Sequence, residues 1–154
     1  MGVSGVLWGI ALINLFLGEY EYRLDQKGRV TIPPRFREEF IQGIVVTRGY
    51  DACLVAYSAT KWDSLAETYA AMSDTDRGSR LINRIVFSSA FKLMLDRLGR
   101  LSLPLSLKTY AHLQDDVVLA GLGSHLEIWS KRNWVKEKTL MEEKASEIAQ
   151  GMNI

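Results

Sequence analysis

The sequence contains few of the residues from which disulfide scaffolds and zinc sites are built. Cys53 is the only cysteine among 154 residues, so no intramolecular disulfide can form and a secreted disulfide scaffold is excluded. His112 and His125 are the only histidines, too few for a zinc site with one cysteine. A reducing cytoplasm is the simplest compartment for this chain, and we expect no metal or other cofactor.

Sequence motifs of enzyme active sites are also missing. Neither the phosphate loop G-x-x-x-x-G-K-[ST] nor the nucleophile elbow G-x-S-x-G occurs. "GLGSHL" at 121–126 lacks the third glycine of a dinucleotide-binding loop and is typical of a turn. The adjacent Asp115 and Asp116 fall at an expected loop-to-strand junction, where a solvated turn is favoured over an acid–base pair. We therefore expect neither an enzyme nor a small-molecule substrate.

The sequence also lacks an excess of charge of either sign. Nineteen Lys and Arg against 18 Asp and Glu give a net charge of +1, which neither indicates nor excludes nucleic acid, because a basic patch can lie on a nearly neutral protein. Residues 1–18 carry no charge, lack the basic region of a secretory signal, and are marginal for a membrane span of roughly 20 apolar residues. Two interpretations of the apolar leader at 1–15 are open: an upstream start assignment, which is favoured, or a membrane-contacting segment.

What the sequence does contain is an internal repeat. "LDQKGRVTIPPRFR" at 24–37 returns as "LDRLGRLSLPLSLK" at 95–108, and "GIVVTRGYDACLVAYSATKW" at 43–62 corresponds to "DDVVLAGLGSHLEIWSKRNW" at 115–134. The shift is 71 in the first block and 72 in the second, so one added residue separates them. Such a repeat predicts the same supersecondary unit twice.

Each copy reads as four short strands around two turns and a proline-led short helix. The expected strands are 18–24, 29–32, 44–48 and 53–57, then 91–95, 100–103, 117–121 and 126–129. Thr60 and Asp63 suggest a capping box for the helix that follows the first copy, and Ser130 opens the last helix. The organisation is then the leader, repeat 1 at 19–61, a helical connector at 62–89, repeat 2 at 90–133 and a C-terminal helix at 134–154.

Two copies packed about a pseudo-twofold axis would close a small barrel and remove exposed strand edges. The predicted fold class is therefore α+β, with two β repeats forming a pseudo-twofold barrel and with peripheral helices. The final helix presents Trp134, Met141, Ala145 and Ile148 roughly on one face. A core stripe is the favoured interpretation of that face, and a packing surface for a neighbouring subunit is the alternative.

Basic residues gather around the two D-x-x-G-R turns. The first copy has Arg23, Lys27, Arg29, Arg35 and Arg37, and the second has Arg97, Arg100 and Lys108. One such turn is most simply an Asp–Arg ion pair that braces the backbone. Two turns at pseudo-symmetric positions favour a second function, because arginines on rigid turns reach phosphates and base edges of double-stranded DNA.

The stretches "FLGEYEYRLDQKGRVTIPPRFREEF" and "LDRLGRLSLP" resemble the MraZ family of bacterial transcriptional regulators, built from two SpoVT-AbrB repeats. The resemblance runs from Phe16 to about Ala149. It implies swapped-hairpin β repeats, a ring-shaped homo-oligomer, a cytoplasmic and nucleoid-associated location, and binding to repeated promoter boxes of the division and cell-wall gene cluster. It also implies that the D-x-x-x-R motifs contact DNA. The predicted DNA-binding residues are Asp25, Lys27, Arg29, Arg35, Asp96, Arg97 and Arg100.

Two departures from the family pattern bear on these expectations. Members commonly begin at a methionine just before "FLGEY", where this chain has Leu15. The second turn has Leu98 where the first has Lys27, and Ser106 where the first has Arg35, so the first repeat is expected to contribute more of the DNA contact. The alternatives are a membrane-tethered or scaffold assembly protein and an AbrB-fold antitoxin, although an antitoxin typically has one repeat and a disordered tail.

Overall fold

The computed structural model describes residues 15–154, so the leader apart from Leu15 lies outside the described residues. Repeat 1 and the connector contain the elements β1 (Glu19–Arg23), β2 (Arg29–Thr31), the 3-10 helix η1 (Pro34–Phe40), β3 (Ile44–Arg48), β4 (Leu54–Ser58), α2 (Ala59–Ala70) and α3 (Arg77–Ser88). Repeat 2 and the C-terminal helix contain β5 (Phe91–Leu93), β6 (Arg100–Ser102), α4 (Leu105–Tyr110), β7 (Asp116–Gly121), β8 (Leu126–Ser130) and α5 (Lys131–Gly151). The order of elements predicted from the repeat is therefore confirmed, and the fold is mixed α+β.

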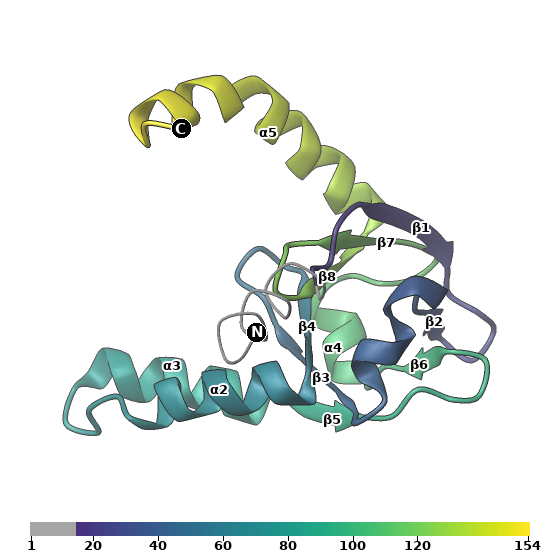
Figure 1. Cartoon of the computed structure of the whole chain (residues 1–154), viewed down its shortest axis with the longest axis horizontal. Coiled ribbons are helices and arrows are strands. Elements are labelled where there is room, and N and C mark those ends of the chain that lie inside the picture. The colour runs from purple at the N-terminus through teal and green to yellow at the C-terminus, as the bar shows by residue number, and fades with distance from the viewer. Residues whose placement is uncertain (1–14) are drawn as a thin grey trace, which may run out of the picture.

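The strands form one six-stranded sheet of order β1-β7-β8-β4-β3-β5 and a two-stranded ribbon of β2 and β6. Every pair is antiparallel. Only β3–β4 and β7–β8 pair within a repeat, whereas β1 pairs with β7, β5 with β3, β4 with β8 and β2 with β6. The two repeats are thus interlocked by reciprocal strand exchange (Figure 1).

Backbone hydrogen bonds do not close these strands into the barrel that the sequence predicted. Within residues 15–154 the large sheet ends at β1 and β5, and β2 and β6 pair only with each other. The two short strands instead cover one face of the sheet, where Val30, Ile32 and Leu101 are fully buried. Aromatic side chains from η1, Phe36 and Phe40, join the same core. This packing removes apolar surface from water, although two strand edges remain.

Helices α2 and α5 each begin directly where a strand ends. Ser58 caps α2 by accepting a hydrogen bond from the amide of Lys61 at 3.2 Å, and Ser130 caps α5 in the same way from Asn133 at 3.1 Å. The expected capping box, with Thr60 as the N-cap, was therefore wrong by two residues. β4 ends at Ser58, and this residue is the N-cap of α2. In Figure 1 the α2–α3 hairpin and α5 both extend away from the sheet. Among the described residues, no helix is both long and apolar enough to cross a membrane.

Candidate nucleic-acid interface

Each D-x-x-x-R motif forms a turn that is organised by its aspartate. Oδ1 of Asp25 accepts hydrogen bonds from the amides of Lys27 and Arg29, both at 2.9 Å. Oδ2 of Asp25 accepts a third from Nε of Arg29 at 2.6 Å. The backbone closes the turn, since the amide of Gly28 donates to the carbonyl of Asp25 at 2.9 Å. One carboxylate thus fixes both the turn and the guanidinium of its arginine.

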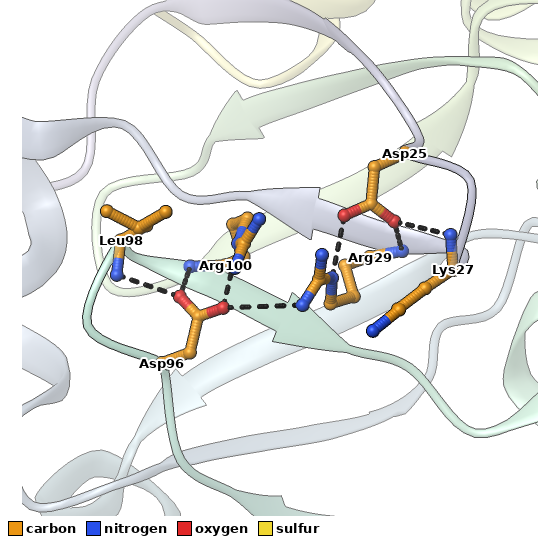
Figure 2. A network of polar contacts seen from close by, with 6 residues as sticks. All are labelled: Asp25, Lys27, Arg29, Asp96, Leu98 and Arg100. Atoms are coloured by element: carbon orange, nitrogen blue, oxygen red, sulfur yellow. Dashed lines mark hydrogen bonds and ion pairs between the residues drawn. The ribbon is translucent and has the colours of Figure 1, made fainter.

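The second turn repeats this geometry bond for bond. Asp96 accepts from the amides of Leu98 and Arg100 at 2.9 and 2.8 Å, and from Nε of Arg100 at 2.7 Å. Figure 2 shows each carboxylate with the backbone amides two and four residues further on and with Nε of the arginine in its own turn. Because the contacts to positions 27 and 98 are made by backbone amides, the change from lysine to leucine leaves the turn intact.

The aspartates are held in their charged form. Hydrogen bonds from the Arg29 backbone, followed by those from the Arg29 side chain and the Lys27 amide, lower the pKa of Asp25 below its usual range. The same contacts from Arg100, and then from Leu98, lower the pKa of Asp96. The turns are therefore ordered at neutral pH with ionised carboxylates.

A glycine is required in each turn for two reasons. Gly28 and Gly99 have φ angles of +70° and +76°, a region that other residues enter only with strain. A Cβ atom at Gly28 would also displace the flexible Nζ end of Lys108, and one at Gly99 would collide with the guanidinium of Arg37. Each glycine therefore allows a cation to lie directly over the turn.

These two cations come from the opposite repeat. Arg37 belongs to η1 of repeat 1 but lies over the second turn, whereas Lys108 belongs to α4 of repeat 2 and lies over the first. The sequence placed each beside the turn of its own repeat, and that placement was wrong because strand exchange brings the helix of one copy to the turn of the other. The shift of 71 between Arg37 and Lys108 identifies them as equivalent residues, but it does not indicate which turn each one reaches.

The two turns are also joined to each other. β2 pairs with β6 so that Arg29 lies opposite Ser102 and Thr31 opposite Arg100. Nη1 of Arg29 lies 3.8 Å from Oδ2 of Asp96, so this arginine contacts both carboxylates (Figure 2). The side chains of Arg29 and Arg100 remain 22% and 30% exposed, so part of each side chain is open to solvent.

The remaining predicted site residues are arranged differently. Lys27 and Arg97 are exposed beside the glycines, and neither forms an ion pair among the described residues. Arg35 donates to the hydroxyl of Tyr20 at 2.9 Å and lies over the Phe36 ring, so it faces β1. The structure thus joins four of the seven predicted residues, Asp25, Arg29, Asp96 and Arg100, in one ion-pair cluster. Lys27 and Arg97 lie on the same two turns, and Arg35 lies apart from them.

Other reactive groups in residues 15–154 do not form a comparable cluster. No group of three His, Cys, Asp or Glu residues there has the geometry of a metal site. Burial, with a further contribution from Glu127, raises the pKa of the Cys53 thiol to about 12, so little thiolate is present at neutral pH. Asp115 and Asp116 each lie 3.8 Å from the guanidinium of Arg23, in exposed ion pairs.

Comparison with known proteins gives consistent results over nearly the whole chain. A family described as "MraZ protein, putative antitoxin-like" matches twice, at residues 15–85 and 86–152. A relative from Roseiflexus castenholzii is 42% identical over 136 residues, which is 88% of this chain and 95% of the relative. Relatives from Thermomicrobium roseum and Halothermothrix orenii are 40% and 38% identical, over 88% and 90% of this chain and 96% of each relative. All three are named "Transcriptional regulator MraZ".

Proposed function

Because the chain belongs to the MraZ family of transcriptional regulators, we propose that it binds DNA through its paired D-x-x-x-R turns. The DNA is double-stranded, and the sites are repeated promoter boxes of the division and cell-wall gene cluster. The protein acts in the cytoplasm, associated with the nucleoid, and has no catalytic role.

The observation that supports this proposal most directly is the fixed orientation of the two arginines. Each aspartate engages Nε of its arginine, and the guanidinium presents its remaining N–H groups in a planar fork. Such a fork matches the O6 and N7 acceptors of guanine or two phosphate oxygens. Because the guanidinium is held before DNA arrives, less conformational entropy is lost when it binds.

The cations around each turn contribute to DNA affinity in a way that does not depend on the base sequence. Lys27 and Lys108 flank Arg29, and Arg97 and Arg37 flank Arg100. Positive side chains in these positions contact phosphates and orient the protein on the duplex. With Arg37 over the second turn, both turns have three cations, so we expect comparable DNA contacts from the two repeats, in contrast to the inequality expected from Leu98 and Ser106.

The reciprocal pairing of strands also supports a swapped-hairpin, pseudo-twofold arrangement of SpoVT-AbrB type. We further propose that the chain forms a homo-oligomer, in the form of a ring. Each subunit then presents one pair of turns, and binding to repeated boxes gains from avidity. Affinity should accordingly fall with salt and be very weak for an isolated subunit.

The experiment is a titration of a DNA fragment from upstream of the protein's own gene with wild type, Arg29→Ala and Arg100→Ala. Each substitution should weaken binding by roughly 5- to 150-fold for every base that the guanidinium no longer reaches, the equivalent of about 1–3 kcal/mol. Arg23→Ala is the matched control, since this exposed arginine pairs with Asp115 and Asp116 instead of a turn. Unchanged binding by a folded, oligomeric Arg29→Ala protein would contradict the proposal.

The alternatives predict other results. An antitoxin would bind a partner protein, whereas the names of the relatives favour a regulator. A membrane-tethered or scaffold protein would fractionate with membranes when isolated untagged and would show no specific footprint on the upstream fragment. Footprinting the wild-type protein upstream of its own gene therefore separates the three functions.

A further inference from the structure

The two long helices that follow the repeats occupy equivalent positions. Ser58 and Ser130 cap them, 72 residues apart, and each helix then packs an indole against the preceding strand. The ring of Trp62 lies 6.2 Å from that of Tyr57, and the ring of Trp134 lies 5.7 Å from that of Trp129. α5 is therefore the counterpart of α2 in the second repeat.

The two helices differ in what covers them. In repeat 1, α3 lies against α2, with the Phe87 ring 6.0 Å from that of Trp62 and 6.4 Å from that of Tyr69. The counterpart of Tyr69 at the shift of 72 is Met141, whose side chain is 41% exposed. In Figure 1 no described helix lies alongside the distal half of α5, so within residues 15–154 the face equivalent to the one that α3 covers in repeat 1 is exposed in repeat 2.

That open face continues along the helix beyond the sheet. At helical spacing Met141, Ala145, Ile148 and Met152 fall on one side, and all four are exposed; we call this side the distal face of α5. In Figure 1 this half of α5 extends away from the strands. From residue 139 to 151 the helix has three glutamates and one lysine, so its distal half is acidic.

A complementary surface lies on α3. Leu81 and Ile85 are exposed there one turn apart, with Arg77 and Arg84 beside them; these four residues form the outer face of α3. The helix contains three arginines and no acidic residue, so it is basic. An apolar pair on this basic helix matches the apolar distal face of α5, because the distal half of α5 carries a net negative charge.

We propose that the outer face of α3 in one copy docks on the distal face of α5 in a second copy. The second copy thereby provides in trans the helix that α2 already has in cis. This inference rests on the proposed homo-oligomer and assigns its interface. Because the two faces differ, the contact is head-to-tail, the class that generates rings when the rotation closes.

The experiment measures molar mass by light scattering and native mass spectrometry for two interface variants. Leu81→Glu places an acid on the outer face of α3, where it would meet the acidic half of α5. Met141→Lys places a cation on the distal face of α5, where it would meet the basic α3. Leu140→Lys is the matched control, since Leu140 is equally exposed but lies about 100° around the helix from Met141.

We expect the wild type and Leu140→Lys to be oligomeric, and Leu81→Glu and Met141→Lys each to be monomeric. Both variants should keep the wild-type circular dichroism spectrum, because the substituted side chains are exposed. An equimolar mixture of the two variants should form heterodimers, since one variant retains an intact α5 face and the other an intact α3 face.

The outcomes distinguish this inference from the proposed function. A wild type that is itself monomeric would overturn the homo-oligomer and this interface together. An oligomeric wild type with an equally oligomeric Met141→Lys variant would overturn the interface alone. If Leu81→Glu stayed oligomeric while Met141→Lys did not, α5 would contact another surface, and the head-to-tail pairing would be wrong.

Discussion

Phe16 provides a test of where the folded structure begins. Its side chain is 3% exposed, and its ring lies 5.4 Å from that of Phe40 and 5.1 Å from that of Phe36. Its backbone exchanges two hydrogen bonds of 2.8 Å with Gly123. We therefore predict that Phe16→Ala is strongly destabilising, even though Phe16 precedes the first strand.

The magnitude follows from the size of the buried ring. Truncating a buried phenylalanine costs about 3–5 kcal/mol, because apolar burial is removed and a cavity remains. For a domain of this length, each kcal/mol lowers the melting temperature by about 2–4 °C, so the expected decrease is roughly 6–20 °C. The assay is thermal unfolding followed by circular dichroism at a fixed protein concentration.

The neighbouring residue is the control. Leu17 is 60% exposed, so Leu17→Ala should change stability by no more than about 0.5 kcal/mol. Gly121→Ala is a second perturbation of the same contact, since a Cβ there would collide with the backbone carbonyl of Phe16. A Phe16→Ala protein that melts within about 2 °C of the Leu17→Ala protein would refute the assignment of Phe16 to the core.

Three further predictions concern the turns. Gly28→Ala should lower the melting temperature by about 2–8 °C, because a left-handed conformation costs other residues about 1–2 kcal/mol. Differential scanning calorimetry measures this decrease, and a decrease of less than about 2 °C would contradict the prediction. The lowered pKa of Asp25 means that its stabilising bonds to Arg29 are fully present above the ordinary aspartate pKa of about 3.9 and are lost as the pH falls through the lower folded value. Acid unfolding curves should therefore be shallower for Asp25→Asn than for the wild type, and identical curves would contradict this. Arg37→Ala and Lys108→Ala should each reduce the slope of log affinity against log salt by about 0.9 per subunit engaged, and an unchanged slope would remove that cation from the interface.

The sequence was sufficient to predict the order of strands and helices, because both repeats show period-two alternation and the same turn residues. The aspartate–glycine–arginine turns were predicted for the same reason, since their hydrogen bonds join residues at most four positions apart. Local interactions of this kind are encoded in local spacing. The position of Gly28 at positive φ is one such consequence.

Partners distant in the chain could not be predicted in the same way. A repeat shift identifies equivalent residues but does not say whether a strand pairs with its own copy or the other one. For that reason Arg37 and Lys108 were assigned to the wrong turns. The burial of Phe16 could likewise not be predicted from the sequence, because its partners Phe36 and Phe40 are 20 or more residues away and no periodic pattern connects them.

The exchange of strands between the repeats has a consequence for how the protein is made. β1 is synthesised first among the described strands, but its partner β7 emerges from the ribosome roughly a hundred residues later. Before repeat 2 has been synthesised, β2 likewise lacks its partner β6, and β3 can pair with β4 but not with β5. A nascent chain that stops after the first repeat therefore has unpaired strand edges and no complete core. Folding is completed only near the end of translation, and a truncated message would yield an aggregation-prone fragment instead of a half-active regulator.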